Sequence, residues 1–440
     1  MNNFSYKNNT TAHHASTSRA VENQEFSTCQ LFVENLAIAK IAKTVGTPFY
    51  CYSKNSLVQN YQNFANAFKG TNHKICYAIK ANPSISIVKI FADLGAGIDA
   101  VSMGEIYRAL KAGINPKKIV FAGVGKTREE MAFALKNNIE EFSIESEPEL
   151  FLLNEVATSL NLKAKIALRV NPNVDAKTHS KISTGKKGDK FGIDIEDAPH
   201  IYQLAKNLAG VEVFGISTHI GSQITSMAPF RAAFLKIRDL CLELRSQGFN
   251  IRNLDFGGGI GILYNDETPI LIEDYADLIK EITSDLNVSI TIAPGRALVG
   301  SSGILVSEVI YIKKTTGRDF LIIDAAMNDL MRPGLYDSYH KVIPILQKKG
   351  TDAIFDVAGP VCESTDILAK NRHLIDPKSG DLIAFLSAGA YGASMSNEYN
   401  SRPLIPEVLV DGDKFEIIRR RPSYEEMLSL ESHTPILTLK

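Results

Sequence analysis

The sequence has few cysteines, almost no net charge and no long apolar run. Its five cysteines are scattered through 440 residues without a Cys-x-x-Cys spacing, which argues against a disulfide framework or a metal site and for free thiols in a reducing compartment. A formal net charge of −1 gives no overall attraction to nucleic acid or to an anionic membrane. No apolar run approaches the roughly 20 residues that cross a bilayer. We therefore expect a cytoplasmic protein with no metal, no nucleic-acid partner and no membrane partner.

The first residues lack the apolar core of a signal peptide. Residues 1–25 are rich in Asn, Ser and Thr, a composition that predicts a disordered tail. Residues 26–53 include a helical stretch ending near Gly46 and an apolar strand, Thr47–Tyr52. We expect this N-terminal segment to join a β domain formed later in the chain.

From Ile75 onward, short apolar runs alternate with helix-like segments. Eight runs read as strands: Ile75–Lys80, Gly97–Ser102, Lys118–Gly123, Glu141–Ser146, Lys163–Pro172, Val211–Ile220, Ile251–Gly259 and Ser289–Arg296. Eight strands, each followed by a crossover, is the count of a (β/α)8 barrel, although an open doubly wound sheet uses the same alternation. The count alone therefore leaves both architectures open.

The position of the polar residues favours the barrel. Seven of the eight strands carry a polar residue or a glycine run at or just past their C-terminal end: Lys80, Ser102, Glu145, Arg169, His219, Gly257–Gly259 and Arg296. Barrel enzymes build their sites on that face. We predict a TIM-like barrel over residues 54–300. From Gly303 the pattern becomes β-rich, with an Asp-Gly hairpin signature between Leu409 and Ile417, so residues 301–440 are expected to form an all-β domain.

Lys80 ends an apolar run and is followed at once by Asn82-Pro83. One explanation is a lysine at a strand end whose stem lies on the core while its ammonium reaches water. The other is a lysine in a dry pocket, with a lowered pKa, that forms a Schiff base with a carbonyl compound or with pyridoxal phosphate. The nine residues from Ile75 to Pro83 leave both explanations open.

Glycines and a histidine at neighbouring strand ends indicate an anion site. Gly257–Gly259 closes the seventh strand and Pro294-Gly295-Arg296 closes the eighth. A lone glycine triplet predicts only a tight turn, whereas two such loops side by side let backbone N–H groups approach a phosphate. His219 ends the sixth strand and is a candidate for stacking on a flat cofactor or exchanging protons with it. Lysine, phosphate cradle and imidazole on one face together predict a pyridoxal phosphate site.

The sequence resembles the diaminopimelate decarboxylases, a family of pyridoxal phosphate enzymes with a barrel and a β domain. The resemblance runs from about residue 30 to residue 425 and rests on seven motifs in order: Tyr77–Asn82, His219–Gln223, Gly257–Gly259, Pro294–Arg296, Asp324–Pro333, Gly359–Ser364 and Gly389–Gly392. It implies a carbon–carbon lyase that converts meso-2,6-diaminopimelate to L-lysine and CO2, the last step of lysine biosynthesis.

The resemblance implies two sets of site residues. For the cofactor, Lys80 would form the Schiff base, His219 would stack on the pyridine ring, and the remaining contacts would come from Asp99, Arg169, Ser222, Gly257, Gly258, Gly259, Ala293, Pro294, Gly295, Arg296 and Tyr391. For the substrate, carboxylate contacts would come from Arg296, Arg332 and Tyr336, Tyr391 would be a further substrate contact, and Glu363 would bind the distal amino group. Cys362 would donate a proton to the carbanion left after CO2 departs. In the family this Cys-Glu pair serves the neighbouring subunit, so a homodimer with shared active sites is implied.

Alternatives remain at this stage. The family usually has Glu, paired with the pyridine nitrogen, where this chain has Ala293, so a catalytically weakened homologue is one of them. A decarboxylase of ornithine, arginine or carboxynorspermidine is another, but Glu363 together with Arg332 and Tyr336 favours a substrate with a second carboxylate. An alanine racemase shares the barrel-plus-β plan and would lack the Cys-Glu-Ser loop. The other role for Cys362, a buried small hydrophobe, fits its polar loop poorly.

Overall fold

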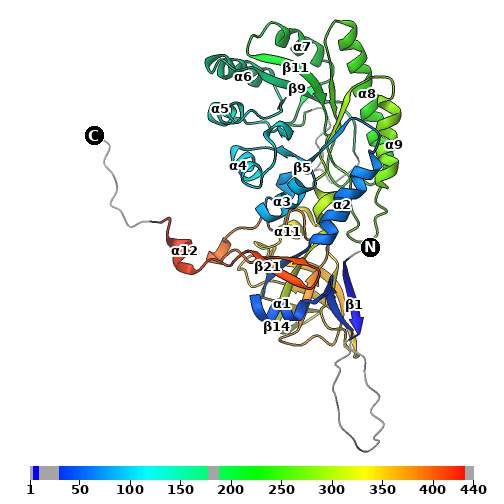
Figure 1. The fold of residues 1–440 in the computed structure, drawn as a ribbon. Helices are drawn as coiled ribbons and strands as arrows, with labels where there is room; N and C mark the ends of the chain where they lie inside the picture. The colour runs from blue at the N-terminus through cyan, green and yellow to red at the C-terminus, as the bar shows by residue number, and fades with distance from the viewer. Residues whose placement is uncertain (1–2, 9–28, 177–187, 432–440) are drawn as a thin grey trace, which may run out of the picture. The chain divides into compact units, whose positions relative to one another are not determined.

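The computed structural model describes residues 3–8, 29–176 and 188–431, which form two compact units (Figure 1). The barrel domain consists of Lys54–Ser302 and Gly389–Ser394. The β domain consists of Met1–Ser53, Gly303–Ala388 and Met395–Lys440. The change of domain after Ser302 lies close to the expected boundary at residue 300, whereas the short return of Gly389–Ser394 to the barrel domain was not expected.

Eight parallel strands close the barrel. They are β5 (His73–Ala78), β6 (Gly97–Ala100), β7 (Ile119–Phe121), β8 (Glu141–Ile144), β9 (Ala164–Asn171), β11 (Val211–Ser217), β12 (Asn253–Asp255) and β13 (Ser289–Ile292). Pairing of β13 with β5 and of β8 with β9 completes the ring. The short strand β10 (Ile193–Asp194) extends β9 at its C-terminal end, with Ile193 opposite Val170. The predicted (β/α)8 barrel is confirmed.

The helices of the barrel domain lie outside the strands (Figure 1). They are α2 (Lys54–Ala67), α3 (Ile85–Asp93), α4 (Met103–Lys111), α5 (Arg128–Lys136), α6 (Glu147–Ser159), α7 (Ala198–Lys206), α8 (Met227–Ser246), α9 (Ile272–Thr283) and the single turn α10 (Arg296–Val299). Three of them begin at a serine or threonine cap: the side chains of Ser102, Thr127 and Ser146 each accept a backbone N–H from the glutamate three residues later. These caps satisfy exposed N–H groups and fix where each strand-end loop turns into a helix.

All eight barrel strands end earlier than the sequence predicted, and in two of them the difference changes where predicted site residues lie. β5 stops at Ala78, and a 3-10 turn over Ile79–Ala81 carries Lys80. The expected seventh strand over Ile251–Gly259 is only Asn253–Asp255. Gly257 and Gly259 have φ angles of +65° and +108°, which take the backbone out of the extended region. In both places the residues predicted to be functional therefore lie in the loop beyond the strand.

The β domain contains two sheets. The larger has the order β18–β17–β15–β14–β4–β20–β21, and β19 joins β14 to β16. Its strands are β4 (Phe49–Ser53), β14 (Gly303–Thr315), β15 (Arg318–Ile323), β16 (Val342–Pro344), β17 (Asp352–Ala358), β18 (Ile367–Ile375), β19 (Leu382–Phe385), β20 (Glu407–Asp411) and β21 (Lys414–Arg419). The smaller sheet is β1 (Phe4–Asn8), β2 (Cys29–Val33) and β3 (Leu36–Ala37). Short helices α1 (Ile38–Val45), α11 (Arg332–Tyr336) and α12 (Tyr424–Leu428) complete the domain.

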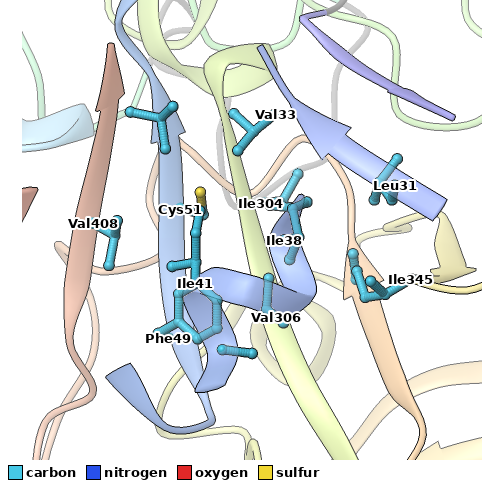
Figure 2. Close-up of a cluster of buried hydrophobic side chains, with 13 residues drawn as sticks. Leu31, Val33, Ile38, Ile41, Phe49, Cys51, Ile304, Val306, Ile345 and Val408 are labelled. Carbon is cyan, nitrogen blue, oxygen red and sulfur yellow. The ribbon is translucent and has the colours of Figure 1, made fainter. Parts of the chain in front are cut away.

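One hydrophobic core holds the N-terminal segment in the β domain. β4 pairs with both β14 and β20, so residues from the two ends of the chain share a sheet. Figure 2 shows Phe49 and Cys51 of β4 among side chains of α1, β14 and β20, including Ile38, Ile304 and Val408. Removing this much apolar surface from water stabilises the domain by about 25 cal/mol per Å² buried.

The prediction of a disordered tail over residues 1–25 is wrong for Phe4–Asn8. Phe4–Asn8 forms β1, antiparallel to β2 with Phe4 opposite Val33. Phe4 and Tyr6 pack against the hydrophobic core, and the Tyr6 hydroxyl donates to the Pro344 carbonyl. The prediction failed because it considered the Asn- and Ser-rich composition and overlooked these two aromatic residues, which alternate along the strand and pack on the core. The rest of the predicted tail, residues 1–2 and 9–25, lies outside the described residues. Within the described ranges no helix is both long and apolar enough to cross a membrane.

Candidate active site

The C-terminal face of the barrel carries most of the predicted site residues. Lys80 follows β5, Asp99 lies near the end of β6, and Arg169 lies near the end of β9. His219 follows β11, and Arg296 is the first residue of α10 after β13. Because parallel strands end on the same side of a barrel, these side chains share one rim.

The turn that carries Lys80 is fixed by hydrogen bonds on both sides. The Tyr77 hydroxyl donates to the Asn82 carbonyl oxygen over 2.9 Å. From the short return segment, the Tyr391 N–H donates to the Ala81 carbonyl oxygen over 2.8 Å, and Asn82 Nδ2 donates to the Gly389 carbonyl oxygen over 3.2 Å. Asn82 is fully buried while Lys80 is half-buried. The sequence therefore presents a lysine from a rigid turn rather than from a mobile loop.

The positive charge of Lys80 affects the pKa of two neighbouring groups, Asp99 and His219. Burial raises the pKa of Asp99, and the positive charges of Lys80 and Arg169 oppose that rise. Burial lowers the pKa of His219 well below its ordinary value, and Lys80 and Arg169 lower it further. His219 Nδ1 accepts the Gly258 N–H over 3.3 Å, so the proton of the neutral ring lies on Nε2. A neutral flat ring beside a lysine suits stacking on a cofactor better than proton donation.

Arg169 is held by a carboxylate that the predicted site did not include. Its guanidinium forms an ion pair with Glu145 over 2.8 Å and lies 4.8 Å from the centre of the Phe191 ring. The two oxygens of Glu145 also accept the N–H groups of Gly123, at 3.1 Å, and Gly192, at 2.9 Å. Glu145 thus ties together three strand-end loops and fixes the arginine. Its signal in the sequence was a polar residue ending the fourth apolar run.

Arg296 lies in a pocket of hydroxyl groups and aromatic rings. Although it is charged, it is only 6% exposed. Its guanidinium donates to the Tyr264 hydroxyl over 2.7 Å and to Ser222 Oγ over 2.8 Å. The Tyr391 ring centre lies 4.9 Å away and the Tyr264 ring centre 5.7 Å away. Such a cation can bind an anionic phosphate or carboxylate through charge-assisted hydrogen bonds. Nothing in the sequence around Tyr264 marked it as a site residue.

The predicted glycines allow neighbouring loops to pack backbone against backbone. A Cβ on Gly257 would lie 2.5 Å from the Thr218 carbonyl oxygen, and one on Gly259 would lie 2.5 Å from the Gly221 carbonyl oxygen. A Cβ on Gly258 would overlap the Ala293 carbonyl group. Only glycine permits this approach. The loops after β11, β12 and β13 therefore pack backbone against backbone, and we call these three loops the backbone cradle.

The loop after β13 extends the cradle toward Lys80. The Ala293 N–H donates to the Gly257 carbonyl oxygen over 2.7 Å, and the Ala78 N–H donates to the Pro294 carbonyl oxygen over 3.2 Å. A Cβ on Gly295 would lie 3.1 Å from the Ala78 Cβ. Ala293, Pro294 and Gly295 thus connect the glycine loop to the end of the strand that precedes Lys80.

Asp255 is a further buried carboxyl group at this rim. It ends β12, and its Oδ1 accepts the Gly257 N–H over 2.8 Å. Burial raises the pKa of Asp255 to about 7, against the lowering effect of that N–H. Its position two residues before the glycine run was the available sequence signal.

The remaining predicted residues lie in the β domain. Arg332 is buried at the start of α11 and shares a 2.8 Å hydrogen bond with His340 Nε2, while Tyr336 ends the same helix and is half-buried. Cys362 and Glu363 lie in the exposed loop between β17 and β18. All five cysteines fall within the described residues, and Cys362 is the exposed one among them. The barrel domain therefore gathers the predicted cofactor residues, and the β domain carries the predicted proton donor.

Known proteins resemble the chain over almost its whole length. Residues 54–300 match the family model described as the pyridoxal binding domain of pyridoxal-dependent decarboxylases. The diaminopimelate decarboxylase of Vibrio cholerae is 45% identical over 407 residues, covering 92% of this chain and 97% of that protein. The enzyme of that name from Zymomonas mobilis is 46% identical over 403 residues, covering 90% of this chain and 96% of that protein.

Solved structures of diaminopimelate decarboxylases also resemble the chain over most of its length. The crystal structure of diaminopimelate decarboxylase from Helicobacter pylori complexed with L-lysine has a TM-score of 0.87 at 43% identity, covering 90% of this chain and 99% of that one. The corresponding structure from M. jannaschii in co-complex with L-lysine has a TM-score of 0.88 at 37% identity, covering 92% of this chain and 96% of that one. With Lys80 and the buried Arg296 on one rim of the barrel, and with this similarity across both domains, the chain belongs to the diaminopimelate decarboxylase family of pyridoxal-dependent decarboxylases.

Proposed function

We propose that the chain catalyses the pyridoxal phosphate-dependent decarboxylation of meso-2,6-diaminopimelate to L-lysine and CO2, the last step of lysine biosynthesis. The observation that carries this proposal is the common rim shared by Lys80, His219 and the buried Arg296, in a chain 45% identical to a named diaminopimelate decarboxylase. The relatives solved with L-lysine are described as complexes with the proposed product.

The residues present fit the cofactor. Lys80 would hold it covalently, the neutral ring of His219 would stack on it, and Asp99 and Arg169 would border the same space. The phosphate would lie in the backbone cradle of Gly257, Gly258, Gly259 and Gly295, beside Ser222, Arg296 and Tyr391. When bound, pyridoxal phosphate supplies an electron sink for the electron pair left by the departing carboxylate.

The chain's own side chains would then orient the substrate and supply a proton. Arginines bind carboxylates through two parallel hydrogen bonds, which suits Arg296 and Arg332, and Tyr336 and Tyr391 would be further substrate contacts. Glu363 would pair with the distal ammonium group. The Cys362 thiol, which is exposed, would donate a proton to the carbon that has lost CO2. A substrate with two amino-acid ends makes use of all of these groups, whereas ornithine or arginine would leave carboxylate-binding residues unused.

We also propose a cytoplasmic homodimer with shared active sites. The five free thiols fit a reducing compartment. The exposed Cys362 and Glu363 would serve the partner subunit's cofactor. Mixing Lys80→Ala protein with Cys362→Ala protein tests the sharing. In a twofold symmetric dimer, random exchange gives about one quarter of wild-type activity from two inactive parents. Continued inactivity after subunit exchange, verified by mass spectrometry, would refute shared sites.

The proposed reaction is tested by a substrate panel. Purified protein with pyridoxal phosphate is given meso-diaminopimelate, L-ornithine and L-arginine in parallel, and released CO2 is recorded. We expect release from meso-diaminopimelate at a kcat/KM at least about a hundredfold above the other two, because unused carboxylate-binding groups cost several kcal/mol. Lys80→Ala is the inactive control. A cofactor-loaded protein that releases CO2 from none of the three would instead be a non-catalytic homologue.

A further inference from the structure

Two loops of the β domain carry the residues proposed to handle substrate and proton. One loop, Ala325–Met331, leads into Arg332. The other, Gly359–Thr365, carries Cys362 and Glu363. Between them lies Asp366, a carboxylate that is only 3% exposed and that belongs to no site described above.

Asp366 binds both loops through separate oxygens. Its Oδ1 accepts the Met327 N–H over 2.6 Å, and its Oδ2 accepts the Val361 N–H over 2.7 Å. Its backbone adds two further bonds to the second loop: the Asp366 carbonyl oxygen accepts the Gly359 N–H over 3.1 Å, and the Asp366 N–H donates to the Glu363 carbonyl oxygen over 3.0 Å. Val361 immediately precedes Cys362, so the constraint reaches the proposed proton donor.

The surroundings are shaped to receive this carboxylate. A Cβ on Gly359 would lie 2.5 Å from Oδ2, 2.6 Å from Oδ1 and 2.7 Å from the Ala325 carbonyl oxygen. No side chain fits there while Asp366 occupies its position. The glycine is thus required by the carboxylate, and the two residues act as a unit.

An ionised aspartate is the residue type that suits this position. A carboxylate offers acceptors on both oxygens, whereas an asparagine would turn its NH2 group toward one of the two N–H donors. Burial raises the pKa of Asp366, and the Met327 and Val361 N–H groups and the positive charge of Arg402 oppose that rise. Leaving a buried N–H without its acceptor costs about 1–3 kcal/mol.

We propose that Asp366 is a positioning residue that locks the Cys362–Glu363 loop to the loop preceding Arg332, so that proton donor, ammonium-binding carboxylate and substrate arginine are presented in one fixed arrangement. This inference rests on the proposed function for the roles of Cys362, Glu363 and Arg332. The locking itself rests on the bonds of Asp366 alone.

The test compares Asp366→Asn with Asp356→Asn. Asp356 is also 3% exposed in the β domain, and it accepts the Asn371 N–H over 2.8 Å and pairs with Arg318 over 2.9 Å. Two properties are measured: the alkylation rate of Cys362 by iodoacetamide in cofactor-free protein, read by mass spectrometry, and kcat and KM for meso-diaminopimelate. The cofactor absorbance spectrum is recorded as a check on the barrel domain.

We expect both variants to lose thermal stability, but only Asp366→Asn to label Cys362 faster, by about tenfold, and to lower kcat by tenfold to a hundredfold, on the order that a displaced catalytic group costs. Its cofactor spectrum should match that of the wild type. Gly359→Ala, which forces the carboxylate aside, should act in the same direction and provides the reading should Asp366→Asn not fold. Labelling and kcat that match those of Asp356→Asn would overturn the proposal. Labelling needs no turnover, so the two claims can fail separately. An inactive wild type would refute the proposed reaction, while faster labelling of Cys362 in Asp366→Asn would still support the lock.

Discussion

The Arg296 guanidinium donates a 2.7 Å hydrogen bond to the Tyr264 hydroxyl inside the barrel domain. A buried cation is costly unless its donors are satisfied, and this tyrosine both satisfies one donor and presents its ring to the charge. Ser222 binds a second donor of the same group. The arginine is therefore held in place before any anion arrives.

Tyr264→Phe should weaken cofactor binding by about tenfold, because it removes a hydrogen bond to a charged group, worth roughly 1.5–3 kcal/mol, and leaves the ring. Arg296→Gln should weaken it further. Titration of cofactor-free protein with pyridoxal phosphate, followed by absorbance, measures both. Tyr311→Phe, at an exposed tyrosine of the β domain, is the control. An unchanged Kd in Tyr264→Phe would show that the arginine needs no such support.

Lys126→Met should destabilise the protein by about 3–5 kcal/mol. The Lys126 ammonium is buried and binds Glu149 over 2.6 Å, together with the carbonyl oxygens of Gly123 and Ser143. Burial raises the pKa of Glu149 and the lysine opposes that rise, so removing the lysine leaves a carboxylate without its charge partner. Arg128→Met is the control, since its ion pair with Glu155 is exposed and worth about 0–1 kcal/mol. Equal shifts in denaturation midpoint would contradict this account.

Glu141→Gln should stabilise the protein more at alkaline pH than at acid pH. Burial and the charge of Asp255 together raise the pKa of Glu141 to about 8, whereas the unfolded value is about 4.3. The folded state therefore binds this proton more tightly, and the free energy of unfolding of the wild type falls as pH rises from about 4.3 through 8.

Melting temperatures at pH 5 and pH 8.5 measure the effect. Between these two pH values, the difference in free energy of unfolding between Glu141→Gln and the wild type should grow by an amount on the order of 1–3 kcal/mol. Glu147→Gln, on the exposed face of α6, should show no such growth. A constant difference across this range would mean that Glu141 is ionised in the folded protein.

Ala293→Glu should raise kcat. Ala293 is buried at the rim, with its N–H bonded to Gly257. A carboxylate introduced there would pair with a protonated pyridine nitrogen, and a protonated ring is the better electron sink. Ala293→Gln, of similar size and without charge, separates the charge effect from a packing effect. An unchanged or lower kcat in Ala293→Glu would count against the idea that the missing carboxylate at this position limits kcat.

Sequence patterns located the barrel because its strands are apolar and seven of the eight end in a polar residue or a glycine run. Lys80, Arg169 and His219 could be found in this way, since a charged or ionisable side chain that closes an apolar run is unusual. The same pattern failed for β1 and β18. In β1 two aromatic residues lie within an Asn- and Ser-rich stretch, and in β18 the central Lys370, Asn371 and Arg372 are mostly exposed.

Single buried polar residues were beyond sequence reasoning. Asp366, His340 and Tyr264 each act through partners that are distant in sequence or in an unrelated motif: Met327 for Asp366, Leu386 for His340 and Arg296 for Tyr264. Such contacts depend on the tertiary arrangement, because a lone Asp, His or Tyr in a loop has no periodicity and no spacing that would reveal its partner.

The most direct measurement is product identity. Purified protein with pyridoxal phosphate and meso-diaminopimelate should yield L-lysine and CO2 in equal amounts, quantified by chiral chromatography and CO2 capture, and Lys80→Ala should yield neither. CO2 without L-lysine, or equal yields from wild type and Lys80→Ala, would contradict the assignment of this chain as a diaminopimelate decarboxylase that works through Lys80.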